Sequence, residues 1–141
     1  VRSQASLLPR TKLMFQNMID ELFVYTRKKI DRKSNEILFY QDGEQLSPYK
    51  LSSGEKQMLV ILLTALVRDG EHSVLFMDEP EASLHIEWQQ RLISMLRELN
   101  PNLQLILTTH SPAVIMDGWL DVVTEMDEIT TPIEHGSFSK A

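Results

Sequence analysis

The sequence contains no cysteine among its 141 residues, so disulfide bonds and thiolate metal sites are excluded. It also lacks a long apolar run, because the longest such stretch, residues 58–63, is far too short to cross a bilayer. No signal-peptide pattern opens the chain. We therefore expect a cytoplasmic protein without a membrane partner, of a length that is typical of one domain.

Charge is distributed unevenly along the chain, and only its first part is basic. Residues 1–50 carry 9 Lys and Arg against 6 Asp and Glu, whereas residues 51–141 carry 5 against 14. The acidic part is a poor candidate for a nucleic-acid surface. The basic part offers one cluster, residues 27–33, which we interpret as a solvated helix end with cations at the negative pole of the helix; a nucleic-acid contact is the alternative.

A helix is predicted over about residues 11–30, after an entry segment, residues 1–10, that shows no periodicity. Thr11 is a suitable N-cap for this helix. The apolar side chains that recur at helical spacing on one face are Phe15, Met18, Ile19, Leu22 and Phe23. This pattern is typical of an amphipathic helix packed on a core.

A β-hairpin is predicted after this helix. Residues 36–40 are typical of a strand, and Asp42-Gly43 is a strong signal for a tight turn. Residues 45–50 can pair back as a short second strand, which Pro48 restricts to a sheet edge.

Residues 51–68 have two serines near their start and continue as a helix that is apolar nearly all round. Ser52 or Ser53 can cap this helix, and Asp69-Gly70 ends it. An apolar circumference predicts deep burial, so the polar N-terminal end should reach the surface with free backbone N–H groups. Such an end is suited to binding an anion, although a plain serine cap is the commoner use of these residues.

A short apolar run at residues 74–78 predicts a strand buried on both faces of a parallel sheet. A helix over residues 86–99 and a second buried strand over residues 103–109 follow it, which together form a βαβ unit. The helix is expected to face the core with Leu92, Ile93, Leu96 and Leu99. Beyond this unit, residues 119–123 predict a further short strand, and residues 125–128 an acidic loop.

The βαβ unit should bring Asp78, Glu79 and His110 to one edge of the sheet, because each follows the carboxyl end of a strand. Two carboxylates and a histidine beside a helix N-terminus suit phosphoryl transfer to water. One carboxylate can hold Mg²⁺ through water, the other can polarise the attacking water, and the histidine can donate to a phosphate oxygen. The ordinary alternatives are an acidic turn and a strand-end histidine without a catalytic role.

Four segments resemble the motifs of ABC-type ATPases, in the order and at the spacings of that family. Residues 51–55, Leu-Ser-Ser-Gly-Glu, resemble the signature motif, and residues 74–79 resemble the Walker B strand. Residues 81–85 resemble the loop that follows Walker B, the D-loop, and residues 108–110, Thr-Thr-His, resemble the switch-histidine motif. The resemblance implies an α/β, parallel-sheet P-loop NTPase-like half-domain, preceded here by a helix and a hairpin.

The resemblance also implies roles for single residues. Asp78 would bind Mg²⁺ through water, Glu79 would be the general base for the hydrolytic water, and His110 would contact the γ-phosphate of ATP. The signature residues would reach ATP bound to the opposite subunit of a head-to-tail homodimer that forms on ATP binding, with the D-loop near the interface. The implied nucleotide-contacting set is Ser52, Ser53, Gly54, Glu55, Ser83 and His85.

The Gly-x-x-x-x-Gly-Lys-Ser/Thr phosphate loop, the Walker A motif, is missing, because none of the five glycines is followed by Lys-Ser or Lys-Thr at the required spacing. In this family the loop lies N-terminal to the motifs above, and the chain opens on Val1 rather than methionine. We therefore expect the C-terminal half of one ATPase domain, which by itself hydrolyses ATP poorly. Its expected parts are residues 1–50, the core at residues 51–128 and a polar tail at residues 129–141.

Transporter ATPases usually have an aspartate at the end of the D-loop, where this chain has His85. The patterns Glu-Pro-Glu-x-x-Leu-His and Ser-Ser-Gly-Glu are more similar to the soluble branch of SMC-like, RecF-like and OLD-like ATPases. The favoured hypothesis is therefore ATP hydrolysis coupled to DNA or to a defence effector. A nucleotide-binding subunit of a transporter and a non-catalytic interaction domain are the alternatives.

Overall fold

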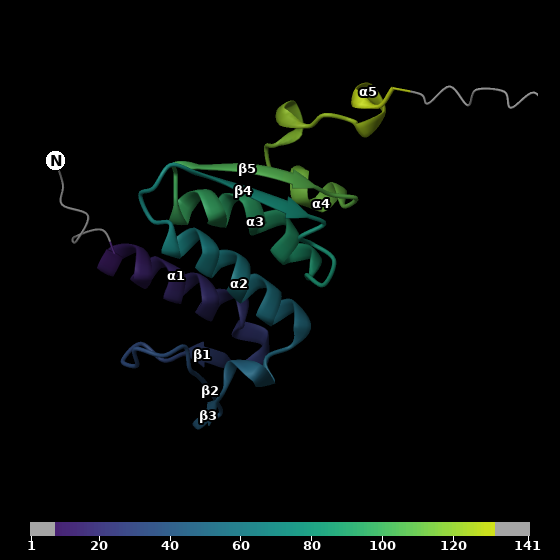
Figure 1. Ribbon diagram of the computed structural model, residues 1–141. Coiled ribbons are helices and arrows are strands. Elements are labelled where there is room, and N and C mark those ends of the chain that lie inside the picture. The colour runs from purple at the N-terminus through teal and green to yellow at the C-terminus, as the bar shows by residue number, and fades with distance from the viewer. Residues whose placement is uncertain (1–7, 132–141) are drawn as a thin grey trace, which may run out of the picture.

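The computed structural model describes residues 8–131, so the expected polar tail from residue 132 and most of the expected entry segment lie outside the described residues. The helices, 3-10 helices (η) and strands follow in the order α1 (Leu8–Leu22), η2 (Val24–Thr26), β1 (Lys28–Ile30), β2 (Phe39–Gln41), β3 (Glu44–Leu46), η3 (Pro48–Lys50), α2 (Ser53–Val67), β4 (Ser73–Asp78), α3 (Ile86–Leu99), β5 (Leu103–Thr108), α4 (Pro112–Ile115), η4 (Leu120–Val122) and α5 (Met126–Ile129) (Figure 1).

Two separate sheets lie at opposite sides of a helical layer. The antiparallel sheet β1-β2-β3 lies at one end, and the parallel pair β4-β5 lies on the other side of α1, α2 and α3 (Figure 1). The three helices contact one another and enclose one apolar core, to which β1 and β2 contribute Ile30 and Phe39. The sheet of interest for function is therefore backed by helices on one face.

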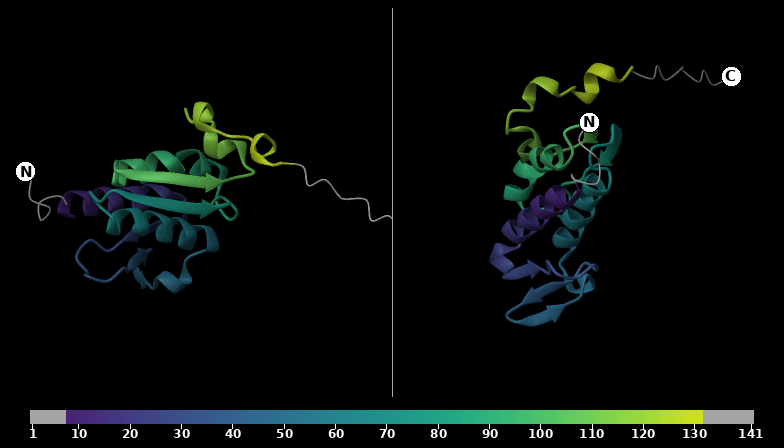
Figure 2. Two further views of the ribbon diagram at one scale, coloured as in Figure 1. Left: turned by 45° about the horizontal axis from the view of Figure 1, so that its top comes forward. Right: turned by 90° about the vertical axis from the view of Figure 1, so that its left-hand side faces the viewer.

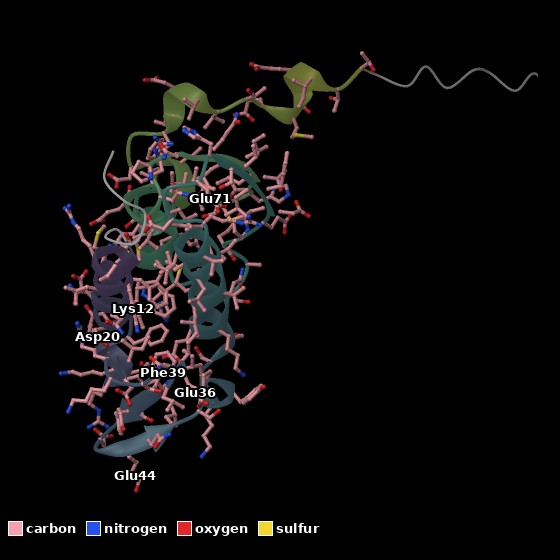
Figure 3. The ribbon with its side chains drawn as sticks, turned by 60° about the vertical axis from the view of Figure 1, so that its left-hand side comes forward. Lys12, Asp20, Glu36, Phe39, Glu44 and Glu71 are labelled. Carbon is pink, nitrogen blue, oxygen red and sulfur yellow. The ribbon has the colours of Figure 1, made fainter. Side chains whose placement is uncertain are left out.

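The first helix ends earlier than its apolar spacing predicts. α1 ends at Leu22, and the chain then turns through Arg27, whose φ of 55° is left-handed, into β1. The N–H of Ile30 donates to Asp20 Oδ1 at 2.8 Å, which fixes β1 against α1, and Phe39 of the neighbouring strand points into the core between the helices (Figure 3). The prediction that residues 27–33 form a helix end is wrong, because strand pairing outweighs helical spacing here.

The predicted hairpin is confirmed. β2 and β3 are antiparallel, and the turn residues Asp42 and Gly43 have φ values of 52° and 87°, which a two-residue turn of this kind requires. The second strand is shorter than predicted, since β3 ends at Leu46 and Pro48 opens a 3-10 helix. A proline has no N–H to donate to a ladder, so this end of the strand is where it should stop.

The predicted βαβ unit is also confirmed. β4 and β5 are parallel, with Ser73 opposite Leu103 and Asp78 opposite Thr108. The side chains predicted to face inward from α3 are buried, namely Leu92, Ile93, Leu96 and Leu99. Asn100, fully buried after the helix, donates to the carbonyl oxygens of Arg68 at 2.5 Å and Glu71 at 3.1 Å, and so joins the ends of α2 and α3.

Burial of β4 on both faces is a wrong prediction. Leu75 and Met77 pack on the core, but the alternate side chains Val74 and Phe76 are 49% and 71% exposed, and Ile106 on β5 is 45% exposed. Successive side chains of a strand point to opposite faces, and within residues 8–131 helices cover one of them. α2 is likewise exposed on one side, at Val60 and Val67.

The segment after β5 contains short helices and extends beyond the sheet, at the end of the molecule opposite to the hairpin (Figure 2). The strand predicted over residues 119–123 is wrong, because η4 occupies residues 120–122, and α5 replaces the expected acidic loop. Apolar side chains in this segment are exposed, including Leu120, Val122 and Met126. A strand needs a ladder partner, and the described residues offer none here.

Candidate functional site

The structure brings Asp78, Glu79 and His110 together at the carboxyl edge of the β4-β5 sheet, as predicted. The hydroxyl of Thr108 donates to Asp78 Oδ1, and the N–H of Glu79 donates to the carbonyl oxygen of Thr108 at 3.1 Å. Glu79 has a left-handed φ of 43°, which turns the chain sharply at the strand end. His110 Nε2 lies 3.0 Å from Glu79 Oε1.

These side chains are open to solvent. The side chain of His110 is 89% exposed and that of Glu79 is 51% exposed. A contact this exposed contributes little to stability, so it orients the carboxylate more than it holds the fold together. The arrangement can present a carboxylate and an imidazole to one ligand.

Glu81 is a buried residue behind this edge that the sequence interpretation left without a role. It is 7% exposed, and its Oε1 accepts hydrogen bonds from the N–H of His110 at 3.0 Å, the N–H of Ser111 at 3.3 Å and the hydroxyl of Thr109. Burial acts to raise the pKa of Glu81, but these donors outweigh it, and the pKa lies below the ordinary value. The parallel topology was the signal for this contact, because it sets residues 79–81 against residues 108–111.

Two glutamines hold the loop between β4 and α3. Gln57 Nε2 on α2 donates to the carbonyl oxygen of Pro80 at 2.5 Å, and Gln89 Nε2 on α3 donates to that of Leu84 at 2.9 Å. Ser111 Oγ donates in turn to Gln89 Oε1 at 2.5 Å. The segments after both strands are therefore tied to the helices beneath them.

The second part of the site is the N-terminal end of α2. Ser52 is the N-cap: its Oγ accepts from the N–H of Glu55 at 3.2 Å, while Glu55 Oε2 accepts from the N–H of Ser52 at 2.7 Å, so the two form a capping box. Ser52 and Ser53 are exposed, whereas Gly54 and Glu55 are buried. The predicted capped helix start is confirmed.

Gly54 lies against the D-loop of the same chain. A Cβ built at Gly54 would be 2.4 Å from the carbonyl oxygen of Ser83, so only glycine fits this contact. Ser83 and His85 are exposed, and the His85 ring lies 5.9 Å from the Trp88 ring, centroid to centroid. The signature and D-loop residues are thus neighbours within one chain.

The position of Glu55 does not suit the nucleotide contact predicted for it. Its side chain is 1% exposed and pairs with Lys28, whose Nζ lies 2.9 Å from Oε1 and 2.7 Å from Oε2, and Thr26 Oγ1 donates to Oε1 at 2.7 Å. Burial acts to raise the pKa of Glu55, but the bonds from Lys28, Ser52 and Thr26 outweigh it and lower the pKa. Its carboxylate therefore stabilises the helix start from inside.

A metal ion could be held here by one carboxylate. Among residues 8–131 no group of three or more acidic or histidine side chains could hold a metal ion. Asp78 is exposed beside a hollow of about 440 Å³ between α2 and β4, whose walls include Lys56, Ile61 and Met77. Asp78 alone could hold Mg²⁺ only together with waters and phosphate oxygens, which is how this ion usually binds.

Known proteins resemble parts of this chain. It is 32% identical over 101 residues to "Retron Vc95 probable ATPase" of Vibrio cholerae serotype O1 biovar El Tor, covering 62% of this chain and 20% of that protein. It is 42% identical over 62 residues to "ABC transporter A family member 7" of Dictyostelium discoideum, covering 44% of this chain and 7% of that protein. The chain therefore spans a fifth or less of the length of these relatives.

A solved structure supports the fold. The structure described as "Crystal structure of the SmcHead bound to the C-winged helix domain of ScpA" matches with a TM-score of 0.52 at 15% identity, covering 74% of this chain and 36% of that chain. The predicted α/β fold of P-loop NTPases is confirmed.

No helix in the described part of the chain has the length and apolarity to cross a membrane.

A family match covers most of the chain. Residues 6–117 match the family described as "AAA domain, putative AbiEii toxin, Type IV TA system". The match includes all four segments that resemble ABC-type motifs. Together with the SMC-like fold, it confirms an ABC- and SMC-like P-loop ATPase domain. The chain belongs to this AAA-domain family.

Proposed function

We propose that this chain supplies two parts of an ATPase domain. One is the sheet edge with Asp78, Glu79 and His110, and the other is the signature end, residues 52–54 at the start of α2. A Walker A loop outside these residues completes the domain. The observation that carries the proposal is the meeting of Asp78, Glu79 and His110 at one sheet edge, with His110 Nε2 3.0 Å from Glu79 Oε1 and both side chains exposed.

Each residue of the edge has a proposed task. Asp78 would hold Mg²⁺ through water, and the ion would supply charge neutralisation for the phosphates. Glu79 polarises the attacking water, and its left-handed backbone, fixed to Thr108, aims the carboxylate out of the sheet. His110 orients Glu79 through Nε2 before ATP binds, and would donate to the terminal phosphate from a backbone position fixed by Glu81.

The signature end would act on ATP held by a second copy. Ser52 and Ser53 are exposed at the start of a 15-residue helix, whose N-terminal N–H groups suit a phosphate. Gly54 packs on the D-loop, so Ser83 and His85 would lie at the same interface. A head-to-tail homodimer that forms on ATP binding uses both halves of the site.

The proposed setting is a cytoplasmic defence system in which ATP hydrolysis drives an effector. The family description names a toxin of a type IV system, and a relative carries the name of a retron ATPase. A DNA contact through residues 27–33 is the weaker part of this proposal. Lys28 is buried on Glu55 and is not available for such a contact. Arg27 and Arg32 pair with Asp42 and Asp20 at the surface, and Lys29 and Lys33 are exposed.

A transporter nucleotide-binding subunit is the second candidate, because 62 residues of the chain are 42% identical to a protein named as an ABC transporter. It predicts that the full-length protein co-purifies with a membrane partner. Recovery of the full-length protein from the soluble fraction without such a partner would exclude it.

The test of the proposal is Glu79→Gln in the full-length protein. We expect the rate constant of ATP hydrolysis to fall by about 10²-fold or more, because an isosteric amide cannot act as a base. ATP binding, measured with a fluorescent analogue, should persist. Glu98→Gln, an exposed glutamate on α3, is the matched control and should hydrolyse ATP normally.

Two results would contradict the proposal. One is an unchanged hydrolysis rate in Glu79→Gln. The other is robust ATP turnover by residues 1–141 alone that Glu79→Gln abolishes, because that would show that no further phosphate-binding loop is needed.

A further inference from the structure

Lys28 and Glu55 form an ion pair inside the protein. The Lys28 side chain is 11% exposed and that of Glu55 is 1% exposed, and Nζ lies 2.9 Å and 2.7 Å from the two carboxylate oxygens. The pair joins elements far apart in the sequence, since Lys28 lies on β1 and Glu55 in the first turn of α2. A buried charge must keep its partner, because an unpaired charge inside a protein is strongly unfavourable.

The same carboxylate also fixes Ser52. Oε2 of Glu55 accepts from Lys28 Nζ at 2.7 Å and from the N–H of Ser52 at 2.7 Å, and Oε1 accepts from Lys28 and from Thr26 Oγ1 at 2.7 Å. Both oxygens therefore accept hydrogen bonds from residues 26–28. One of them, Oε2, also accepts from the backbone N–H of the N-cap, Ser52. The lysine, the glutamate and the serine form one connected chain of contacts.

An ordinary capping box is complete without a lysine, because it needs a serine oxygen and a glutamate oxygen alone. Glutamate is normally exposed in such a box, and here it is buried. The lysine supplies the charge that keeps the carboxylate ionised in this place, as the lowered pKa of Glu55 indicates. The position of Ser52 thus depends on β1.

We infer that Lys28 is a positioning residue for the signature end: acting through Glu55, it sets the place of Ser52 and so the ATP-dependent association of two copies. This inference rests on the proposed function, in which Ser52 reaches the terminal phosphate of ATP bound to the partner copy. Lys28 touches no nucleotide. Its effect passes through one carboxylate to one backbone N–H group.

The experiment uses the full-length protein carrying Glu79→Gln, so that bound ATP is not consumed. Dimer formation is measured by analytical ultracentrifugation at saturating ATP and Mg²⁺, and ATP affinity is measured on dilute monomer. Lys28→Met should raise the dimer dissociation constant by about 10-fold or more, within the usual range for coupled sites, while the ATP affinity of the monomer stays unchanged. Lys28→Arg should restore most of the association.

Arg27→Met is the matched control, because Arg27 is adjacent in sequence and its pair with Asp42 is on the surface, with side chains 73% and 53% exposed. It should leave dimer formation unchanged. Equal weakening by Arg27→Met and Lys28→Met, or dimer formation by Lys28→Met as tight as in the parent, would overturn the inference. A merely structural lysine would lower ATP affinity and dimer formation together.

If a melting experiment shows that Lys28→Met does not fold, the dimer measurement is repeated on the double variant Lys28→Met with Glu55→Gln. This double variant leaves no buried charge unpaired. Weaker dimers from this double variant support the inference, and dimers as tight as the parent overturn it. Ser52→Ala separates the two proposals. If it leaves the dimer unchanged, the proposed role of the signature end fails; if it weakens the dimer and the lysine variants do not, only the role of Lys28 fails.

Discussion

At both ends of the site a buried glutamate accepts a hydrogen bond from the backbone of an exposed residue, but the other donors to the two glutamates differ. At the sheet edge the buried Glu81 accepts from the N–H of His110 at 3.0 Å; at the signature end the buried Glu55 accepts from the N–H of Ser52 at 2.7 Å. Each glutamate fixes the backbone of an exposed residue. Glu81 receives neutral donors from the end of β5, whereas Glu55 receives a lysine from β1.

The difference shows which end depends on the antiparallel sheet. The sheet edge is built by one βαβ unit and is tied to α2 through Gln57, and none of the contacts described above for it comes from the antiparallel sheet. The signature end depends on the antiparallel sheet, which lies on the other side of the helices (Figure 1). A disturbance of β1 should therefore reach Ser52 and leave His110 in place.

The largest effect that tests this separation is expected for Glu81→Ala in the full-length protein. Three donors lose their acceptor, and at about 1 kcal/mol for each bond the local loss is about 3 kcal/mol. Amide hydrogen exchange at residues 110 and 111 should rise by about 100-fold, while residues 52–55 keep their protection. Glu81→Gln retains an acceptor oxygen, so its amide exchange rates should rise less. Equal acceleration at both segments would contradict the separation.

A smaller effect is expected from acid. The pKa values of Glu55 and Glu81 lie below the ordinary value of 4.5, so their contribution to stability is complete above that pH and is lost as the pH falls through the folded-state values. The melting temperature of the full-length protein should fall below pH 4.5. Glu55→Gln and Glu81→Gln should each show a shallower fall, and curves parallel to that of the wild-type protein would contradict this.

The smallest effect on stability is expected for His110→Ala. The side chain is 89% exposed, and an exposed pair contributes at most about 1 kcal/mol. The melting temperature should barely change, whereas the rate constant of ATP hydrolysis should fall by about 10²-fold if His110 donates to the phosphate. A large loss of stability with normal turnover would show that the histidine is structural.

The sequence predicts what is encoded locally. The Asp42-Gly43 turn, the Ser52 cap and the βαβ unit follow from short patterns, and the meeting of Asp78, Glu79 and His110 follows from the parallel topology. β1 was missed because Ile30 continues the helical spacing of Phe23, and because the cations that begin at Arg27 were interpreted as the end of that helix. Its strand character comes from its partner β2, which no local pattern reveals.

The Lys28–Glu55 pair could not be predicted from the sequence for a similar reason. Lys28 and Glu55 are far apart in the chain, and a basic residue at a surface-like position gives no sign of being buried. Glu55 was assigned to the nucleotide because it belongs to the segment that resembles the signature motif. The exposed face of β4 was missed because an apolar run does not show which of its two faces is covered.

The uncovered face of the β4-β5 sheet also affects the solubility of the protein. Val74, Phe76 and Ile106 form an apolar surface on a sheet of two strands, and such surfaces promote aggregation when they meet water. Residues 1–141 expressed alone should therefore self-associate and precipitate as concentration rises. Mild detergent or Phe76→Lys should restore solubility without altering the opposite, helix-covered face.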